Sequence, residues 1–136
     1  MKSSVKQWIH LAQQDFAAAE RLLSDPPMPS IVAVHLQQAV EKCLKGLLES
    51  AGVRIPKSHD LVWLWQLCKE NLEMDFELDS TPLEGLSAVY MDSRYPSGHG
   101  VLPSGQPALA DVKAYRQLAH QLLDDALSLL DTNRSI

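Results

Sequence analysis

The sequence predicts an all-α protein, folded as an antiparallel up-and-down bundle of about five helices. Five segments repeat apolar residues at spacings of three and four, which places those residues on one face of a helix. The one β-branched cluster, Val53-Arg54-Ile55, is short and ends at a proline, so no strand is expected. Short connections favour antiparallel neighbours. With 136 residues the chain has the size of one domain, expected over residues 1–136.

The first helix is expected over residues 4–24. Ser4 followed by Gln7 has the pattern of a capping box, in which the two side chains satisfy the first free N–H groups. Two prolines follow Asp25 and end the helix, because proline lacks the N–H group and clashes with the preceding turn.

The second helix is expected over residues 30–51. It carries a broad apolar face and is followed by Gly52, which suits the left-handed position after a helix end. Gly46 costs this helix about 1 kcal/mol relative to alanine, unless it lets a neighbouring helix pack closely. The third helix, expected over 59–72, follows Ser58 as its cap.

The fourth helix, expected over residues 82–94, has the clearest start signal. Thr81 stands at the cap, a proline takes the first helical position, and Glu84 follows three residues after the threonine. Residues 95–107 contain three prolines and three glycines and are expected to form a loop.

The fifth helix is expected over residues 108–131 and has two apolar stripes. The second stripe consists of Leu123, Leu127 and Leu130. One core does not require two apolar sides of a helix, so this stripe indicates either a central helix or a dimer surface.

Composition describes an acidic globular protein. Hydrophobic residues make up 46% and charged residues 21%, both typical of a folded domain. The 12 basic and 17 acidic residues give a net charge of −5, which excludes broad attraction to nucleic acid or an acidic membrane but allows a local basic patch. No apolar run reaches the length of a membrane span and no signal peptide is seen, so a cytoplasmic protein is expected. Cys43 and Cys68 are expected to be small buried residues.

The five histidines show no metal-binding pattern. None lies at zinc-ligand spacing from another histidine or a cysteine, and the sequence lacks a phosphate-binding glycine loop, so neither a metal nor a cofactor is expected. His59 is interpreted as a turn residue that packs back on the second helix. Asp60 is expected to interact with the positive N-terminus of the third helix.

The second helix carries one polar stripe beside its apolar face, formed by His35, Gln38 and Lys42. This stripe is interpreted either as a solvated edge or as a polar seam that contacts a ligand, a partner subunit or the loop after Arg94. Glu41 and Lys45 form a favourable pair four residues apart, which is assigned to the surface.

Arg94 and His99, with four residues between them, form a candidate catalytic pair. Arginine suits phosphate recognition because its planar fork makes two hydrogen bonds at once, and histidine transfers protons near neutral pH. Together they would cleave RNA without a metal, the histidine moving a proton and the arginine stabilising the phosphorane charge. In the alternative interpretation Arg94 pairs with a carboxylate such as Asp92, and His99 is an exposed loop residue.

Four segments carry a family resemblance. They are Trp8, Ala12 and Asp15 in the first helix, the stretch from His35 to Lys45 in the second, His59-Asp60-Leu61 opening the third, and Tyr90 with Ser93-Arg94-Tyr95-Pro96 ending the fourth. Together they resemble the HEPN domain family (higher eukaryotes and prokaryotes nucleotide-binding) over essentially the whole chain.

The resemblance implies an antiparallel helical bundle, commonly dimeric and often encoded beside a small nucleotidyltransferase in toxin–antitoxin-like pairs. Some HEPN proteins are metal-independent ribonucleases in which an arginine and a histidine, four to six residues apart, meet at the dimer cleft. Arg94 and His99 match that spacing, whereas Tyr95 replaces the usual small polar residue. The Arg-Tyr-Pro version resembles the branch associated with nucleotidyltransferases. The candidate ligand-binding residues are His35, Gln38, Lys42, Arg94 and Tyr95.

Three functions are therefore weighed. The first is a module that binds nucleotide or RNA phosphate and pairs with a nucleotidyltransferase. The second is a metal-independent ribonuclease toxin that uses Arg94 and His99. The third is a non-catalytic structural adaptor, whose contact surface is the second stripe of the fifth helix. A homodimer is expected, without a membrane partner.

Overall fold

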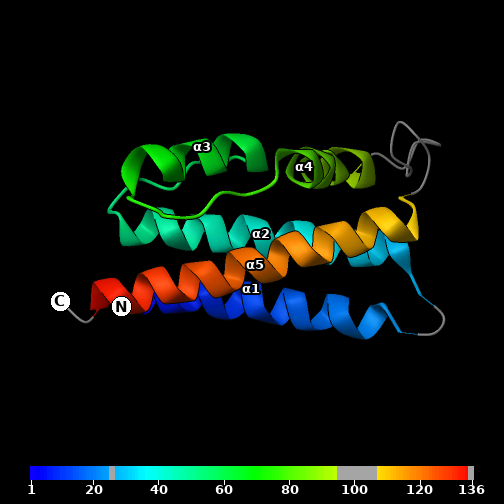
Figure 1. Ribbon diagram of the computed structural model, residues 1–136, viewed down its shortest axis with the longest axis horizontal. Coiled ribbons are helices and arrows are strands. Elements are labelled where there is room, and N and C mark those ends of the chain that lie inside the picture. The colour runs from blue at the N-terminus through cyan, green and yellow to red at the C-terminus, as the bar shows by residue number, and fades with distance from the viewer. Residues whose placement is uncertain (25–26, 95–106, 135–136) are drawn as a thin grey trace.

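The structure is a computed structural model that describes residues 1–24, 27–94 and 107–134, without the side chains of 90–94 and 132–134. Within these residues the chain forms helices and no strand (Figure 1), so the predicted all-α helical bundle is confirmed. The helices are α1 (Ser3–Leu22), α2 (Pro29–Ser50), α3 (Leu61–Asn71), α4 (Ser80–Arg94) and α5 (Leu109–Arg134).

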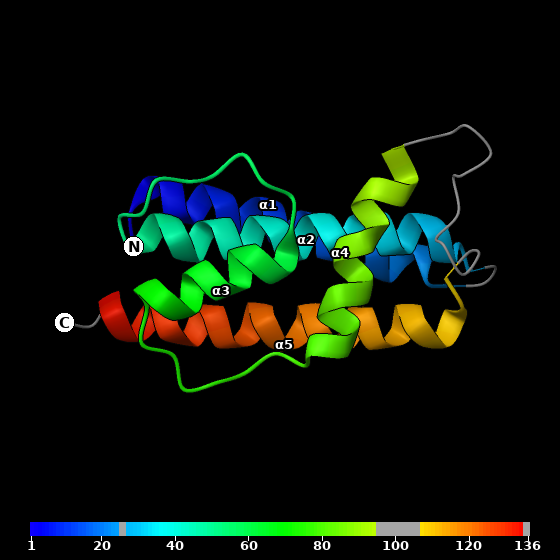
Figure 2. The same ribbon diagram turned by 90° about the horizontal axis from the view of Figure 1, so that it is seen from above.

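The helices form two layers around α2. The long helices α1, α2 and α5 lie side by side, and α3 and α4 cover them on one side (Figure 1, Figure 2). Helix α2 contacts each of the other four helices. One apolar core joins the layers, and its largest fully buried apolar side chains include Leu36, Leu44, Leu47, Leu48, Leu61, Leu64, Leu86 and Leu122.

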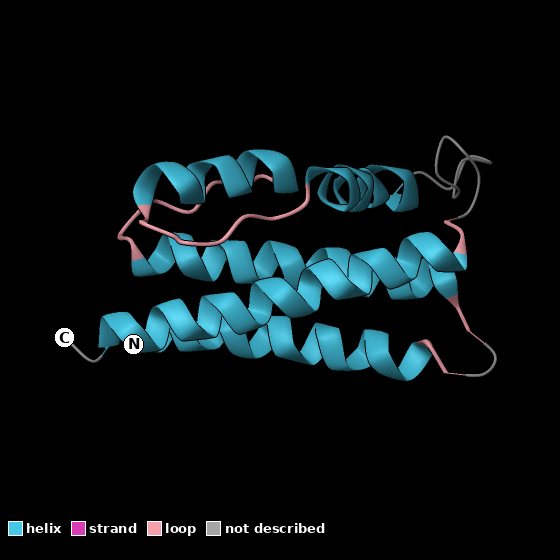
Figure 3. Cartoon of the chain, viewed as in Figure 1, coloured by secondary structure: helices cyan, strands magenta, loops and turns pink. Residues whose placement is uncertain are grey.

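The direction of the helices departs from a strict up-and-down order. Helix α1 runs antiparallel to α2, whereas α2 and α5 run in the same direction (Figure 1). The reason is that α4 crosses the long helices instead of lying along them (Figure 2). The connection 72–79, which contains no regular structure (Figure 3), and α4 together return the chain to the end at which α2 begins.

Two expected caps are replaced by other residues. Helix α1 begins at Ser3, and Ser4 donates its hydroxyl to Glu49 Oε1 at 2.9 Å instead of capping the helix. Helix α3 begins at Leu61, because Asp60 rather than Ser58 is its cap and accepts the N–H of the third residue at 3.1 Å. The predicted interaction of Asp60 with the helix N-terminus is therefore present.

The other helix ends differ by a few residues from the prediction. Helix α4 begins at Ser80, because Asp79 Oδ1 accepts the N–H of Thr81 at 3.2 Å and takes the role expected of that threonine. Helix α2 begins at Pro29, a residue well suited to the first helical turn. Gly52 after α2 has a φ of +73°, as its left-handed position predicted.

The second apolar stripe of α5 is mostly buried inside this chain. Leu123 and Leu130 are 7% and 3% exposed, and Leu127 packs against the same core. The stripe therefore belongs to a helix packed on two sides, and the expectation that it forms the surface of an adaptor is corrected.

The two cysteines are buried free thiols. Burial raises the pKa of Cys68 to about 12. The pKa of Cys43 is also raised, mainly by burial and to a smaller extent by the charge of the neighbouring Cys68 thiolate. Both thiols therefore stay protonated and act as small apolar side chains, as predicted. No helix within the described residues combines the length and the apolar character needed to cross a membrane.

Gly46 lies at a close contact between α1 and α2, as its sequence position suggested. A Cβ atom on this residue would lie 3.1 Å from both Trp8 Cβ and Ile9 Cδ1. Trp8 Cβ is bonded directly to the backbone of α1, so it moves only if the helix moves. The missing side chain therefore sets the separation of the two helices.

We expect Gly46→Val to lower the free energy of unfolding by about 2 kcal/mol, because its methyl groups force α1 away from α2. The matched control is Ala17→Val on the exposed face of α1, which loses only about 0.5 kcal/mol of helix propensity. Urea unfolding followed by circular dichroism measures both. Equal losses in the two variants would show that the close contact is unimportant.

Candidate functional site

The polar stripe of α2 links this helix to α1. Nδ1 of His35 lies 3.1 Å from Asp15 Oδ1, and Nζ of Lys42 lies 2.5 Å from the other oxygen of the same carboxylate. All three side chains are partly buried. The stripe is thus not a fully solvated edge, because its histidine and lysine both contact Asp15 of α1. His35 and Lys42 remain predicted ligand-binding residues, and both contact Asp15.

Gln38 connects the stripe to a second set of polar groups. Its Nε2 donates to Gln37 Oε1 at 2.8 Å, and Gln37 Nε2 donates to Glu41 Oε1 at 3.1 Å. Gln37 is only 1% exposed. Gln38, a predicted ligand-binding residue, is therefore connected through Gln37 to the buried carboxylate of Glu41.

A polar cluster is formed by the buried side chains of Gln37, Glu41 and Lys45 together with His59, which is partly exposed. Lys45 Nζ donates to Glu41 Oε2 at 3.0 Å, and Nδ1 of His59 lies 2.9 Å from Glu41 Oε1. Glu41 and Lys45 are 6% and 7% exposed, so their assignment to the surface is wrong. The expectation that His59 packs back on the second helix is confirmed.

The connection between α2 and α3 explains this burial. After α2 ends, residues 51–60 run back along the helix before α3 begins (Figure 2). This path brings His59 onto the stripe of α2 that carries Glu41. Glu41 and Lys45 would be four residues apart on an exposed or on a buried face of α2, so their spacing alone did not show that residues 51–60 cover them.

The cluster provides hydrogen-bond and charge partners for the carboxylate of Glu41, which is costly to remove from water. Removing an ion from water costs several kcal/mol, which is offset only when each oxygen and each proton finds a partner. Both oxygens of Glu41 are paired, one with the ammonium of Lys45 and the other with Gln37 and His59. An ionised carboxylate only accepts, so Nδ1 of His59 carries the proton in this contact.

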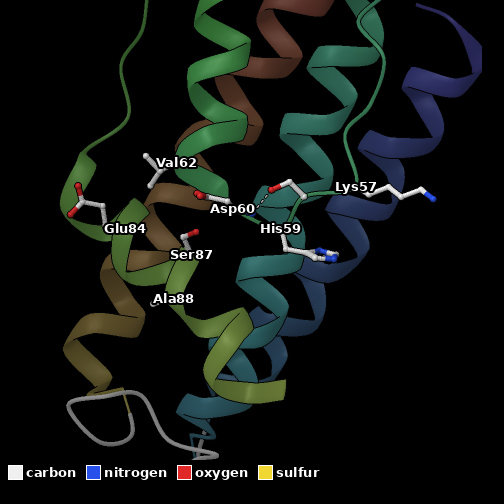
Figure 4. Close-up of a pocket in the computed structure, with 8 residues that line it drawn as sticks. Lys57, His59, Asp60, Val62, Glu84, Ser87 and Ala88 are labelled. Carbon is white, nitrogen blue, oxygen red and sulfur yellow. Dashed lines mark hydrogen bonds between the residues drawn. The ribbon is translucent and has the colours of Figure 1, made fainter. Parts of the chain in front are cut away.

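An open hollow of about 680 Å³ lies between the turn before α3 and the side of α4 (Figure 4). We call it the His59 hollow. It is lined by Lys57, Ser58, His59, Asp60, Val62, Glu84, Ser87 and Ala88. His59 and Glu84 stand at opposite ends, with Asp60 and Ser87 between them (Figure 4). The imidazole of His59 therefore stands at one end and the carboxylate of Glu84 at the other, with the carboxylate of Asp60 between them.

Ser87 fixes the hollow by joining its two walls. Its Oγ accepts the N–H of Leu61, the first residue of α3, at 2.9 Å. A serine hydroxyl also carries one proton to donate, and among the described residues this proton has no assigned acceptor. The wall formed by α4 therefore offers a hydrogen-bond donor inside the hollow.

Arg94 is the last residue of α4, and its side chain lies outside the described residues. Seven positions separate it from Ser87, which amounts to two turns, or about 10 Å, along the same face of the helix. Tyr95 and His99 lie outside the described residues. The candidate pair Arg94 and His99 therefore stays a prediction.

The polar cluster and the hollow contain the residues that sequence reasoning missed. Gln37, Glu41 and Lys45 recur every four residues inside an otherwise apolar face, which was the available signal for a covered polar stripe. Nothing in the local sequence marked Ser87, since its partner is 26 residues away. Within the described residues, no three histidine, cysteine, aspartate or glutamate side chains are grouped closely enough to hold a metal ion.

Comparison with known proteins agrees with this architecture. The HEPN domain family matches residues 5–135 of the chain. The crystal structure of the protein TT1696 from Thermus thermophilus is similar, with a TM-score of 0.70, 21% sequence identity, and coverage of 93% of this chain and 98% of that chain. At this identity the likeness concerns the fold alone. No curated protein matches the sequence.

We expect Lys45→Met to lower the free energy of unfolding by about 3 kcal/mol, because it leaves the Glu41 carboxylate buried without its ammonium partner. The double variant Glu41→Leu/Lys45→Met should recover most of this loss, since no buried charge remains. Lys113→Met, at an exposed position of α5, is the control and should change stability by less than about 0.5 kcal/mol.

Urea unfolding of the four proteins checks these values. A double variant as unstable as Lys45→Met, or a single variant as stable as the control, would contradict the energetic role of the buried pair.

Proposed function

Since this chain belongs to the HEPN domain family, we propose that it is a module that binds nucleotide or RNA phosphate. The observation that carries the proposal is the contact of His59, at the rim of an open hollow, with the buried carboxylate of Glu41. A buried ion pair is weak support for stability, and charged groups held beside a cleft are typical of binding and catalytic sites.

The cations around this place suit phosphate despite the net charge of −5. Lys57 and His59 lie at one end of the hollow, and Arg94 ends the helix that forms its other wall. Attraction to phosphate depends on local charge within roughly a Debye length, about 8 Å at physiological salt. An acidic protein therefore binds phosphate where a few cations gather.

A nucleotidyltransferase partner and a homodimer complete the proposal. The Arg94-Tyr95-Pro96 sequence supports the first, since this version resembles the nucleotidyltransferase-associated branch in toxin–antitoxin-like pairs. Val62, which lines the hollow, and Trp63, the next residue of α3, are 40% and 45% exposed and supply apolar surface at the start of this helix. Aromatic side chains exposed beside a polar site are common in protein interfaces.

We expect Arg94→Ala to weaken the binding of nucleotide or short RNA by about tenfold or more, because a charge-assisted forked contact to phosphate is lost. Arg94→Lys should restore only part of the affinity, since lysine keeps the charge but not the fork. Isothermal titration calorimetry at fixed salt measures the binding, with Arg21→Ala on α1 as the exposed-arginine control.

Two results would sink the proposal. One is a wild-type chain that binds neither nucleotides nor RNA. The other is an Arg94→Ala affinity equal to that of the Arg21→Ala control.

A metal-independent ribonuclease is the second candidate, favoured by the spacing of Arg94 and His99. We expect RNA cleavage in EDTA to be lost in Arg94→Ala and in His99→Ala, because one removes charge stabilisation and the other proton transfer. The measurement is electrophoresis of a labelled RNA, with His10→Ala as the exposed-histidine control. Cleavage that survives both substitutions would exclude this mechanism.

A further inference from the structure

We propose that the His59 hollow binds one nucleoside monophosphate unit, with its phosphate at the His59 end and its ribose and base toward Glu84. This inference rests on the proposed function and adds a place and an orientation for the ligand. The unit is either a free nucleotide or the phosphorylated end of an RNA strand, which share the same chemistry.

The size of the hollow fits a single nucleotide. Its volume of about 680 Å³ lies within the range of about 300–1,000 Å³ that is usual for small-molecule sites. The hollow is open to solvent, so both a free nucleotide and the end of a strand have access to it.

The His59 end is prepared for phosphate by the protein interior. Glu41 Oε1 holds Nδ1 of His59 at 2.9 Å, and Lys45 holds the other oxygen of that carboxylate at 3.0 Å. The ring is thereby oriented from below while 40% of the His59 side chain remains exposed at the rim. Lys57 also lines the hollow on this side, and its side chain extends outward beyond His59 (Figure 4).

The other part of the hollow suits a ribose and a base, and disfavours phosphate. Glu84 is exposed at the far end, and its carboxylate accepts hydrogen bonds from sugar hydroxyls or base amino groups while repelling an anion. Ser87 offers its hydroxyl proton between the two ends. Val62 and Ala88 provide apolar surface for the face of the ligand. The charge difference along the hollow therefore sets the direction of the nucleotide.

Glu41 acts through His59 as a positioning residue and does not face the ligand. It is 6% exposed and lies beneath the histidine. Replacing it by glutamine keeps the size and one hydrogen-bond acceptor but removes the charge that fixes Nδ1–H. Binding should then weaken together with a change in the ring nitrogen resonances of His59, while the free energy of unfolding falls less than in Lys45→Met, because no unpaired buried charge is left.

The test is calorimetric titration of the full chain with the four nucleoside monophosphates, inorganic phosphate, and a 5′-phosphorylated trinucleotide. We expect His59→Ala to weaken nucleotide and phosphate binding by about tenfold, as the loss of one charge-assisted hydrogen bond predicts. His59→Gln, which still donates to Glu41, should fold normally and show the same loss. Glu84→Ala should weaken nucleotide binding but leave phosphate binding unchanged.

Matched controls are His10→Ala and Glu73→Ala, both at exposed positions away from the hollow. Nucleotide binding that is equally strong in the His59 and Glu84 variants and in their controls would overturn this assignment while leaving the proposed function intact. Inorganic phosphate that binds as tightly as the nucleotides would overturn the ribose and base end. A wild-type chain without any nucleotide or RNA binding would overturn both proposals.

The two sources are told apart by the same titrations. Equal affinity for free nucleotides and the trinucleotide supports a free nucleotide as the ligand. Tighter binding of the phosphorylated trinucleotide supports an RNA end.

Discussion

The carboxylate of Glu41, enclosed in the middle of the central helix, is the constraint on which the site depends. It cannot stay ionised there without partners, and each partner comes from a defined place: Gln37 and Lys45 from adjacent turns of α2, and His59 from the turn before α3. To supply the last partner, the chain has to run back along α2 after leaving it. That path also brings the first residue of α3 against α4, through the bond from Leu61 to Ser87. The buried charge and this bond therefore both link the central layer to the second layer of the fold.

A similar arrangement joins α2 to α1 on another side. Asp15 holds a histidine and a lysine of α2, as Glu41 holds a lysine of α2 and a histidine of the following turn. In both cases a carboxylate divides its two oxygens between an imidazole and an ammonium. Such contacts are directional, so they fix the rotation of each element about α2 more sharply than apolar packing does.

The five helices were predictable because each element has an apolar face repeated over several turns, a signal contained in the local sequence. Gly52 and the contact of His59 with α2 were also predictable from the local sequence, the first from its position after a helix end and the second from its position in the turn before a helix. The capping residues were less predictable, because serine, threonine and aspartate stand side by side at these starts, and the path of the incoming chain selects among them. The burial of Glu41 and Lys45 and the role of Ser87 depend on residues distant along the chain. The spacing of apolar residues along one helix does not show which distant segments of the chain pack over that helix.

The missing side chain at Gly46 has a mechanical consequence for the polar links around it. Lys42 and Glu49 stand about one turn before and one turn after the glycine, and both bond to α1, to Asp15 and Ser4 respectively. An apolar contact weakens gradually with separation, whereas hydrogen bonds lose most of their strength within about an ångström of stretch. The separation of α1 and α2 can therefore change very little. A side chain added at Gly46 would stretch the hydrogen bonds of Lys42 and of Glu49 to α1 at the same time.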